Sequence, residues 1–452
     1  MSSETKKKIL FAGDLALLAF AVHLAVNLRL THVNVFSRYT GATFFVVLIY
    51  LLSFFVFDLY SLRLKFTSAS YLSRFLFAIL AGSALMTTVF YFLPKWRFGR
   101  GILVLTIVVA TFLLYGWRLL FQMLFHVAAG RRTIAIVGAG NAGRTIYDIL
   151  STKDFDIKGF LDDDPGKTNE RVGFHAVLGP TSLLAGMAQR KDIDTAVVAI
   201  THERSPELLR SLAQARMNGA EIFDMAQLFE MQTGRIPVLH LRQGWIVFTR
   251  LQGIQQTLYT GHIKRLLDLV LAFVGIVFLL PFGIAVAAAI KLDSAGPVFF
   301  RQKRVGLEGR TYDIVKFRSM VDDAEKNGAQ WAEVNDPRVT RVGKIMRKTR
   351  IDELPQFWNV LRGQMSFVGP RPERPEFVET LKEEIPFYYF RHVIKPGITG
   401  WAQINYRYGA SKNDALEKLQ YDFYYIKNLS PFLDLHILLK TIRVVLFGQG
   451  AR

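Results

Sequence analysis

The stretch KRLLDLVLAFVGIVFLLPFGIAVAAAIKLDS, residues 264–294, decides how the chain is arranged at a membrane. It exceeds the length of about 20 residues that a helix needs to cross the hydrocarbon. Pro281 interrupts its middle and would kink the helix, and basic residues such as Lys264 and Lys291 flank both ends. Because cytoplasmic flanks carry excess positive charge, we expect a helix that enters the membrane, bends and returns. The alternative is a straight crossing, which would put residues 295–452 outside the cell.

Four apolar runs precede this stretch, at residues 9–30, 43–60, 71–93 and 101–125. Each is close to the membrane-crossing length of about 20 residues. The chain is 51% hydrophobic and contains 37 phenylalanines, which is high for a purely soluble protein. Four such runs in succession argue against helices buried in a large soluble core. We therefore predict an N-terminal four-helix transmembrane bundle over residues 1–130.

Basic residues around these runs indicate the orientation of the bundle, because cytoplasmic loops carry an excess of lysine and arginine. One side would carry residues 6–8, Arg63, Lys65, Arg74, Arg131 and Arg132, and the other Arg29, Arg38, Lys95, Arg97 and Arg100. The first set is larger, so we expect both ends of the bundle at the cytoplasmic face. The net charge of +19 fits anionic lipid, a phosphorylated substrate or nucleic acid, and the hydrophobicity favours the first two.

An α/β region follows, from about residue 131 to 250. Its start, RRTIAIVGAGNAGRTIYDIL, has the pattern of a short strand, a glycine-rich turn and a helix. Gly138, Gly140 and Gly143 have the spacing of a dinucleotide-binding turn, and 162–164 are acids where a ribose-binding acid would lie. Further β-rich runs alternate with helical segments, so we predict a Rossmann-like α/β domain with a parallel sheet. The pattern leaves its ligand open between a dinucleotide, a nucleotide sugar and none.

An adjacent acidic pair, Asp352 and Glu353, lies in a strongly basic setting within RIDELPQ, residues 350–356. Apolar residues recur after it at helical spacing, so we expect a helix with Asp352 at the N-cap and Pro355 in the first turn. Helix capping alone would explain the pair. The N-terminus of a helix also attracts phosphate, and nearby cations would hold a carboxylate there in its ionised form.

Several cations accompany this pair in the sequence. Arg371 lies between two prolines, which would hold its guanidinium in place as a phosphate clamp requires. Upstream segments supply Arg301, Arg304, Lys316 and Arg318. Two carboxylates among cations suit phosphoryl transfer with Mg²⁺, in which one carboxylate attacks phosphorus and the other holds the metal. The chain has no cysteine, which excludes thiolate zinc sites and cysteine nucleophiles.

From about Lys264 to the C-terminus, the chain resembles the bacterial sugar transferase family, the monotopic phosphoglycosyl transferases that act on polyprenol phosphate. The resemblance rests on KRLLDLV, GPVFFRQKRVG, KFRSM, RKTRIDELPQFWNVLRGQMSFVGPRP, KPGITGWAQI and YDFYYIKNLSPFLDLHILLKT. The layout is also similar to the large family members, which place a four-helix bundle and a Rossmann-like domain before the transferase. The resemblance implies a linker and re-entrant membrane helix at 251–294 and an α+β catalytic domain at 295–452.

The resemblance implies transfer of a hexose-1-phosphate from a UDP-hexose to undecaprenyl phosphate, with UMP as the other product, at the start of exopolysaccharide, capsule or O-antigen synthesis. Asp352 would be the nucleophile that forms a phosphosugar–aspartyl intermediate, and Glu353 would coordinate Mg²⁺. The residues implied to bind substrate are Arg301, Arg304, Lys316, Arg318, Arg347, Arg371 and Glu373. Those implied to anchor the re-entrant helix are Lys264, Arg265, Asp268 and Pro281, with Leu280 where family members often have serine.

The resemblance also implies partners and a location. UDP-sugars are cytoplasmic, so the catalytic domain is expected on the cytoplasmic face of the bacterial inner membrane, in contact with membrane lipid and not with nucleic acid. We expect a homodimer. No motif identifies the sugar, and the large family members point to glucose or galactose.

Two alternatives stay open. A membrane-bound NAD-dependent nucleotide-sugar dehydratase would need Tyr-x-x-x-Lys on a helix of the Rossmann-like domain. Tyr312 and Lys316 have that spacing, but they lie outside that domain in a run that alternates like a strand. A non-enzymatic scaffold for polysaccharide assembly would not need the pair of Asp352 and Glu353.

Overall fold

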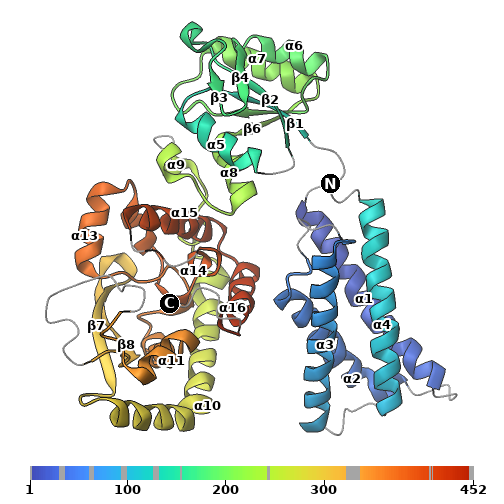
Figure 1. Ribbon diagram of the computed structural model, residues 1–452, viewed down its shortest axis with the longest axis vertical. Coiled ribbons are helices and arrows are strands. Elements are labelled where there is room, and N and C mark those ends of the chain that lie inside the picture. The colour runs from blue at the N-terminus through green and yellow to red at the C-terminus, as the bar shows by residue number, and fades with distance from the viewer. Residues whose placement is uncertain are drawn as a thin grey trace. The chain divides into compact units, whose positions relative to one another are not determined.

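The computed structural model describes residues 3–29, 36–60, 66–92, 99–125, 132–152, 155–241, 245–321, 336–406, 409 and 411–446 (Figure 1). The chain forms two compact units, Met1–Gly130 and Arg131–Arg452. Five basic residues used above to orient the bundle lie outside the described residues, namely Arg63, Lys65, Lys95, Arg97 and Arg131. The orientation of the bundle therefore stays a prediction.

The first unit contains the four predicted apolar helices. They are α1 (Ser3–Arg29), α2 (Phe36–Val56), α3 (Ala69–Phe92) and α4 (Arg100–Leu124). The parts Thr5–Arg29, Tyr71–Phe92 and Arg100–Leu124 are long and apolar enough to cross a membrane, whereas the apolar part of α2, Thr40–Val56, is shorter. This confirms the prediction of four N-terminal apolar helices.

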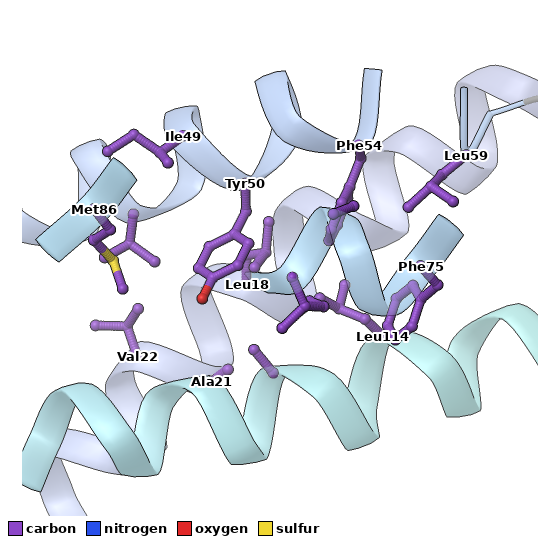
Figure 2. Close-up of a cluster of buried hydrophobic side chains, with 14 of the residues drawn as sticks. Leu18, Ala21, Val22, Ile49, Tyr50, Phe54, Leu59, Phe75, Met86 and Leu114 are labelled. Atoms are coloured by element: carbon purple, nitrogen blue, oxygen red, sulfur yellow. The ribbon is translucent and has the colours of Figure 1, made fainter. Parts of the chain in front are cut away.

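The bundle has an apolar core to which all four helices contribute. Leu18 of α1, Tyr50 of α2, Phe75 of α3 and Leu114 of α4 are all buried in it (Figure 2). Large apolar side chains also face outward, and Phe112 is 75% exposed. An apolar outer surface is expected where a helix bundle is surrounded by lipid instead of water.

A buried ion pair, which the sequence did not suggest, joins three of these helices. Arg118 donates from both terminal nitrogens to the two Asp14 carboxylate oxygens, at 2.8 and 2.9 Å, and from Nε to the Tyr71 hydroxyl at 2.9 Å. Its guanidinium lies over the rings of Phe54 and Phe75. A charge among apolar helices is costly unless it is paired, so this pair fixes how the helices pack together.

The second unit begins with a six-stranded sheet of order β3-β4-β2-β1-β5-β6, parallel except for β3. The strands are β1 (Arg132–Val137), β2 (Phe155–Leu161), β3 (Arg171–Val172), β4 (His175–Gly179), β5 (Thr195–Val198) and β6 (Glu221–Asp224). Two helices cover each face, α5 (Asn141–Ser151) with α8 (Met225–Thr233), and α6 (Leu183–Gln189) with α7 (Pro206–Met217). Alternation along β1 sends Ile134 and Ile136 to the first pair of helices and Ala135 and Val137 to the second. The predicted parallel α/β sheet is confirmed.

The glycine-rich turn lies between β1 and α5, as predicted. Gly138 has φ +106°, and a Cβ on Gly143 would lie 2.1 Å from the Gly138 carbonyl oxygen, so both positions require glycine. Asp162, an acid at the position expected to bind ribose, is already hydrogen-bonded within the domain. Its carboxylate accepts hydrogen bonds from the backbone N–H of Ala139 at 2.8 Å and from Lys167 Nζ at 3.2 Å.

The long apolar helix α10 (Lys264–Asp293) contains Pro281. Figure 1 shows its ribbon turning sharply, so that its two parts run in different directions. A proline inside a helix is a common cause of such a kink. Both ends contact the same domain, because Lys264 Nζ donates to the Val368 carbonyl oxygen at 3.1 Å and Asp293 accepts from the Val342 backbone N–H at 2.9 Å.

Contacts across α10 bear on the two topologies considered above. Glu230, which precedes α10, pairs with Lys427, which follows it, at 2.6 Å. Trp401 Nε1 donates to the Gly234 carbonyl oxygen at 2.7 Å. A membrane cannot separate residues in direct contact, so the segments before and after α10 lie on one side of any membrane that α10 enters. These contacts favour the re-entrant helix over a straight crossing.

The remaining elements form the C-terminal domain that carries the acidic pair. They are β7 (Phe299–Val305), β8 (Thr311–Phe317), α11 (Arg341–Thr349), η6 (Ile351–Gln356), α12 (Phe357–Leu361), β9 (Ser366–Val368), α13 (Pro375–Glu384), η7 (Tyr388–His392), β10 (Gly397–Thr399), α14 (Trp401–Asn405), α15 (Lys412–Asn428) and α16 (Pro431–Leu446). Short helices η3 (Val238–His240) and α9 (Trp245–Phe248) lie in the segment that leads from the sheet to α10. β7 and β8 form an antiparallel hairpin.

Candidate active site

The acidic pair lies in η6, a short 3₁₀ helix that follows α11 directly. Arg350 has φ +60°, and its backbone N–H donates to the Arg347 carbonyl oxygen, which ends α11. Asp352 and Glu353 follow within the next turn and are both buried. The prediction that Asp352 is an N-cap is wrong, because Arg350 occupies that position and no side chain caps η6. The chain passes from one helix to the next without the extended residue that an N-cap needs.

Glu353 is held by three cations. One of its oxygens, Oε1, accepts a hydrogen bond from Arg371 at 2.7 Å and lies 3.4 Å from Lys316 Nζ and 3.7 Å from Arg350. Burial alone would raise the pKa of Glu353, but Arg371, Lys316 and Arg350 together hold it well below its usual range. Glu353 is therefore ionised at neutral pH, while Oε2 receives none of these contacts.

Asp352 has a different environment, although it is the next residue. Its carboxylate accepts no hydrogen bond from any residue that the structure describes, and 8% of the residue is exposed. Burial, and next the charge of Glu353, raise the pKa of Asp352, against the lowering effects of Lys316 and Arg347. This corrects the expectation that a helix terminus and nearby cations lower it. The helices η6 and α12 are short, and the cations mainly engage Glu353.

Strand register decides which β-hairpin cations share a face with Lys316. Phe300 pairs with Lys316, and Arg304 pairs with Tyr312, so these four side chains lie on one face of the hairpin. Arg301 lies on the opposite, exposed face. The structure therefore brings Lys316 to Glu353 and does not bring Arg301 there.

Arg304 contacts the segment that carries Arg371, at Pro372 and Glu373. Arg304 donates to the Pro372 carbonyl oxygen at 3.2 Å and lies 3.8 Å from a Glu373 carboxylate oxygen. Arg391, which sequence reasoning missed, donates to the Arg371 carbonyl oxygen at 2.9 Å. These contacts fix the backbone of Arg371, whose side chain reaches Glu353. The sequence gives no local signal for Arg391, because it lies on η7, twenty residues after Arg371.

Arg347 contacts the segment that follows β8, and Arg318 contacts the end of α10. Arg347 Nε donates to Ser319 Oγ at 3.0 Å, and its charge lowers the pKa of Asp352. Arg318 is almost completely buried and donates from one terminal nitrogen to the Ser294 carbonyl oxygen at 2.8 Å. Its Nε and other terminal nitrogen have no hydrogen-bond partner among the described residues. Arg318 thus links the end of α10 to β8 and keeps two donors unused.

The predicted anchor residues join the start of α10 to this domain. Lys264 pairs with Asp434 at 2.5 Å, a partner on α16 that the sequence did not reveal. Arg265 donates to the Val360 and Leu361 carbonyl oxygens of α12, at 2.6 and 2.8 Å. Asp268 accepts from the Phe367 backbone N–H at 3.0 Å and from Ser366 Oγ at 3.1 Å. The apolar helix is therefore attached directly to α12, the helix that follows the acidic pair.

Comparisons with known proteins identify the relatives of this domain. The bacterial sugar transferase family matches residues 259–448, and the PglD N-terminal domain matches residues 133–205. An undecaprenyl-phosphate glucose phosphotransferase of Komagataeibacter xylinus is 33% identical, over 82% of this chain and 70% of its own length. The chain belongs to the bacterial sugar transferase family. All residues of the acidic pair, its cations and the helix anchors described above fall within the matched range.

A second relative shows how far this similarity extends. A UDP-N-acetylgalactosamine-undecaprenyl-phosphate N-acetylgalactosaminephosphotransferase of Aeromonas hydrophila is 46% identical over 54% of this chain and 56% of its own length. The chain thus spans about half the length of that relative. Among solved structures, RSP in complex with beta-NADH matches 25% of this chain and 53% of its own, at 17% identity and a TM-score of 0.20, which carries no argument.

The acidic pair was predicted to hold Mg²⁺ together with a phosphorylated substrate. No group of three or more His, Asp or Glu side chains that could enclose an ion occurs among the described residues. Mg²⁺ usually takes one or two carboxylates, waters and substrate phosphate oxygens, so such a group is not needed. Asp352 and Glu353 supply two carboxylates at successive positions of η6, and these residues fit the ion.

Proposed function

We propose that the protein transfers a sugar-1-phosphate from a UDP-sugar to undecaprenyl phosphate, the first step in assembly of a bacterial polysaccharide. The observation that carries this proposal is the asymmetry of the acidic pair. Glu353 is fixed by Arg371, Lys316 and Arg350, whereas its neighbour Asp352 accepts no hydrogen bond from a described residue. One carboxylate is thus held in place, and the other is available to react. The family relationship supports the same reaction class.

In the first proposed step, an Asp352 carboxylate oxygen attacks the phosphorus that bears the sugar. A bond forms between that oxygen and phosphorus, and the bond from phosphorus to the bridging oxygen of the diphosphate breaks. UMP leaves with the bonding electron pair. The raised pKa of Asp352 favours this role, because a more basic carboxylate is the better nucleophile, provided that it is ionised.

In the second proposed step, an oxygen of the lipid phosphate attacks the same phosphorus. The aspartyl–phosphorus bond breaks, Asp352 is regenerated as a carboxylate, and the sugar leaves on a lipid diphosphate. Arg371, Lys316 and Arg347 surround the pair and would stabilise negative charge on the phosphate oxygens in both steps. Mg²⁺ bound through Glu353 would supply further neutralisation of that charge.

The anchor contacts support a position of the acidic pair near the membrane surface. A lipid phosphate lies at headgroup depth, and Arg265 ties the apolar helix α10 to α12, next to the acidic pair. We place the catalytic domain on the cytoplasmic face of the bacterial inner membrane, where the UDP-sugar is available. The homodimer stays a prediction, and a mass measurement of the detergent-solubilised protein checks it.

The geometry of Tyr312 and Lys316 argues against the dehydratase alternative. Tyr312 and Lys316 lie on strand β8, where four residues span about 13 Å, whereas a catalytic Tyr-x-x-x-Lys needs the two side chains together on one helical face. Lys316 is also engaged with Glu353. The scaffold alternative does not account for a buried carboxylate beside three cations, which is costly to maintain without a role.

The test is release of UMP by purified protein given Mg²⁺, undecaprenyl phosphate and one UDP-sugar at a time. The panel contains UDP-glucose, UDP-galactose and UDP-N-acetylgalactosamine. We expect UMP from at least one donor, none from the Asp352→Asn variant and none when a chelator removes Mg²⁺. Release of UMP by Asp352→Asn at the wild-type rate, or no release from any donor by folded protein, would refute the proposal.

A further inference from the structure

The backbone that carries Arg371 is hydrogen-bonded at every carbonyl oxygen from residue 370 to 373. The donors, in chain order, are the Gly397 backbone N–H, Arg391, Arg304 and the Val305 backbone N–H, at 2.9, 2.9, 3.2 and 3.0 Å. Pro370 and Pro372 also fix φ on both sides of Arg371. The place of the Arg371 side chain is therefore set by the groups that hold this segment.

Arg391 is the donor that bonds to Arg371 itself. It lies on η7 and is almost completely buried. One terminal nitrogen, Nη1, donates to the Tyr388 hydroxyl at 2.7 Å, and the guanidinium lies 5.2 Å from the centre of the Tyr388 ring. The other, Nη2, donates to the Arg371 carbonyl oxygen and lies 2.9 Å from Asp422 Oδ2. Partners on both sides thus fix the orientation of the guanidinium.

Asp422 lies on α15 and is the charged partner of Arg391. Its residue is only 2% exposed, and burial raises its pKa to about 6 against the lowering effect of Arg391, so the carboxylate is ionised at pH 7. A buried ion pair contributes little net stability, because removing both charges from water costs about as much as their attraction returns. Stability alone is therefore a weak reason for this pair.

The contacts of the pair lead to the acidic site. Asp422 contacts Arg391, Arg391 bonds to the Arg371 backbone, and the Arg371 side chain donates to Glu353 Oε1 at 2.7 Å. These contacts connect α15, through η7, to η6. A displacement of about 1 Å at a catalytic group can lower a reaction rate about 100-fold, so a small shift of Arg371 would matter.

We propose that Arg391 and Asp422 are positioning residues for the transfer reaction. Asp422 orients the Arg391 guanidinium, Arg391 fixes the Arg371 backbone, and Arg371 then holds Glu353 next to Asp352. The role in the reaction rests on the proposed transferase function. The simpler explanation is an ion pair that only joins α15 to η7, and the experiment separates the two.

The first measurement is kcat and KM for the UDP-sugar in the UMP-release assay, with full-length protein. Asp422→Asn removes the charge that orients Arg391 and keeps the shape of the side chain. Arg391→Lys keeps a charge beside Asp422 but loses the planar fork that reaches Arg371 and Tyr388 together. Glu417→Gln is the matched control, because Glu417 is also an acid of α15 paired with an arginine, Arg235.

We expect Asp422→Asn and Arg391→Lys to lower kcat by about tenfold or more, with KM within about twofold of wild type. Glu417→Gln should keep the kcat of wild type. If Asp422→Asn does not fold, Arg391→Lys takes its place in both measurements. No UMP from wild type would refute the transferase function, and the second measurement does not depend on activity.

The second measurement is the loss of Tm caused by Arg371→Ala in two backgrounds. In wild type the loss should be about 4–8 °C near pH 7. In Asp422→Asn it should be less than about half as large, because Arg371 is no longer held against Glu353. An ion pair that only joins two helices gives equal losses, since independent sites add. The proposal is overturned by equal losses, or by a kcat in both variants within about twofold of Glu417→Gln.

Discussion

Replacing Arg371 by alanine tests the electrostatic basis of the site. Arg371 donates the shortest contact to Glu353, at 2.7 Å, and the Glu353 side chain is only 9% exposed. A hydrogen bond to a charged group contributes about 1.5–3 kcal/mol, and leaving a buried charge without partners costs about 3–5 kcal/mol. Lys316 and Arg350 remain beside Glu353 in the variant, so the lower range applies. We expect Arg371→Ala to lose about 2 kcal/mol of folding stability near neutral pH.

The loss should depend on pH with a definite sign. The folded-state pKa of Glu353 lies below its ordinary value of about 4.3, so its stabilising contribution is present above that value and is lost as pH falls through the folded-state pKa. Arg371→Ala moves the folded-state pKa back toward the ordinary value. The difference between wild type and variant should therefore be largest near pH 7 and should shrink below about pH 4.

The assay is thermal unfolding of the detergent-solubilised protein at several pH values. A loss of 1 kcal/mol lowers Tm by about 2–4 °C in a domain of 150–250 residues, so a shift of about 4–8 °C is expected near pH 7. Arg310→Ala is the control, because its ion pair with Glu308 is exposed and such pairs contribute about 0–1 kcal/mol. The reasoning is refuted if Arg371→Ala is as stable as Arg310→Ala at pH 7, or if its deficit grows on acidification.

Three further predictions concern residues other than the acidic pair and its cations. Arg118→Leu should lower the folding stability by about 3–5 kcal/mol, because it leaves Asp14 buried without its partner. The double variant that also carries Asp14→Leu should regain much of the lost thermal stability. Tyr312→Phe should leave Tm unchanged or raise it, since the buried Tyr312 hydroxyl has no partner among the described residues, and a fall of several degrees would contradict this. Because the chain has no cysteine, single Phe174→Cys and Lys412→Cys variants can be labelled with a thiol reagent from one side of sealed vesicles. A re-entrant α10 predicts that both cysteines react from the same side, and reaction from opposite sides would exclude it.

Local sequence patterns predicted the elements of the fold well. The four N-terminal helices and α10 are long apolar runs, and their length alone indicated them. The parallel sheet followed from β-rich runs alternating with helical ones and from the glycine-rich turn at Gly138. These features depend on residues close together in the chain, and a sequence displays them directly.

Features that depend on distant residues were missed or placed wrongly. Asp434 meets Lys264 across 170 positions, and Arg391 reaches the backbone of Arg371 only because η7 packs beside that segment. Arg301 appeared equivalent to its neighbours on β7, but the register of the hairpin turns it away from the acidic pair. The direction of the pKa shift of Asp352 follows from burial, which the sequence does not give.

The most direct test of the central claim is detection of a covalent intermediate on Asp352. Protein is incubated with Mg²⁺ and an active UDP-sugar but without lipid acceptor, then quenched and analysed by mass spectrometry. We expect a burst of at most one UMP per chain and a sugar-phosphate adduct on the peptide that contains Asp352, with neither in Asp352→Asn. If UMP appears only after lipid phosphate is added and no adduct forms, the phosphate moves directly between the substrates, and Asp352 is not the nucleophile.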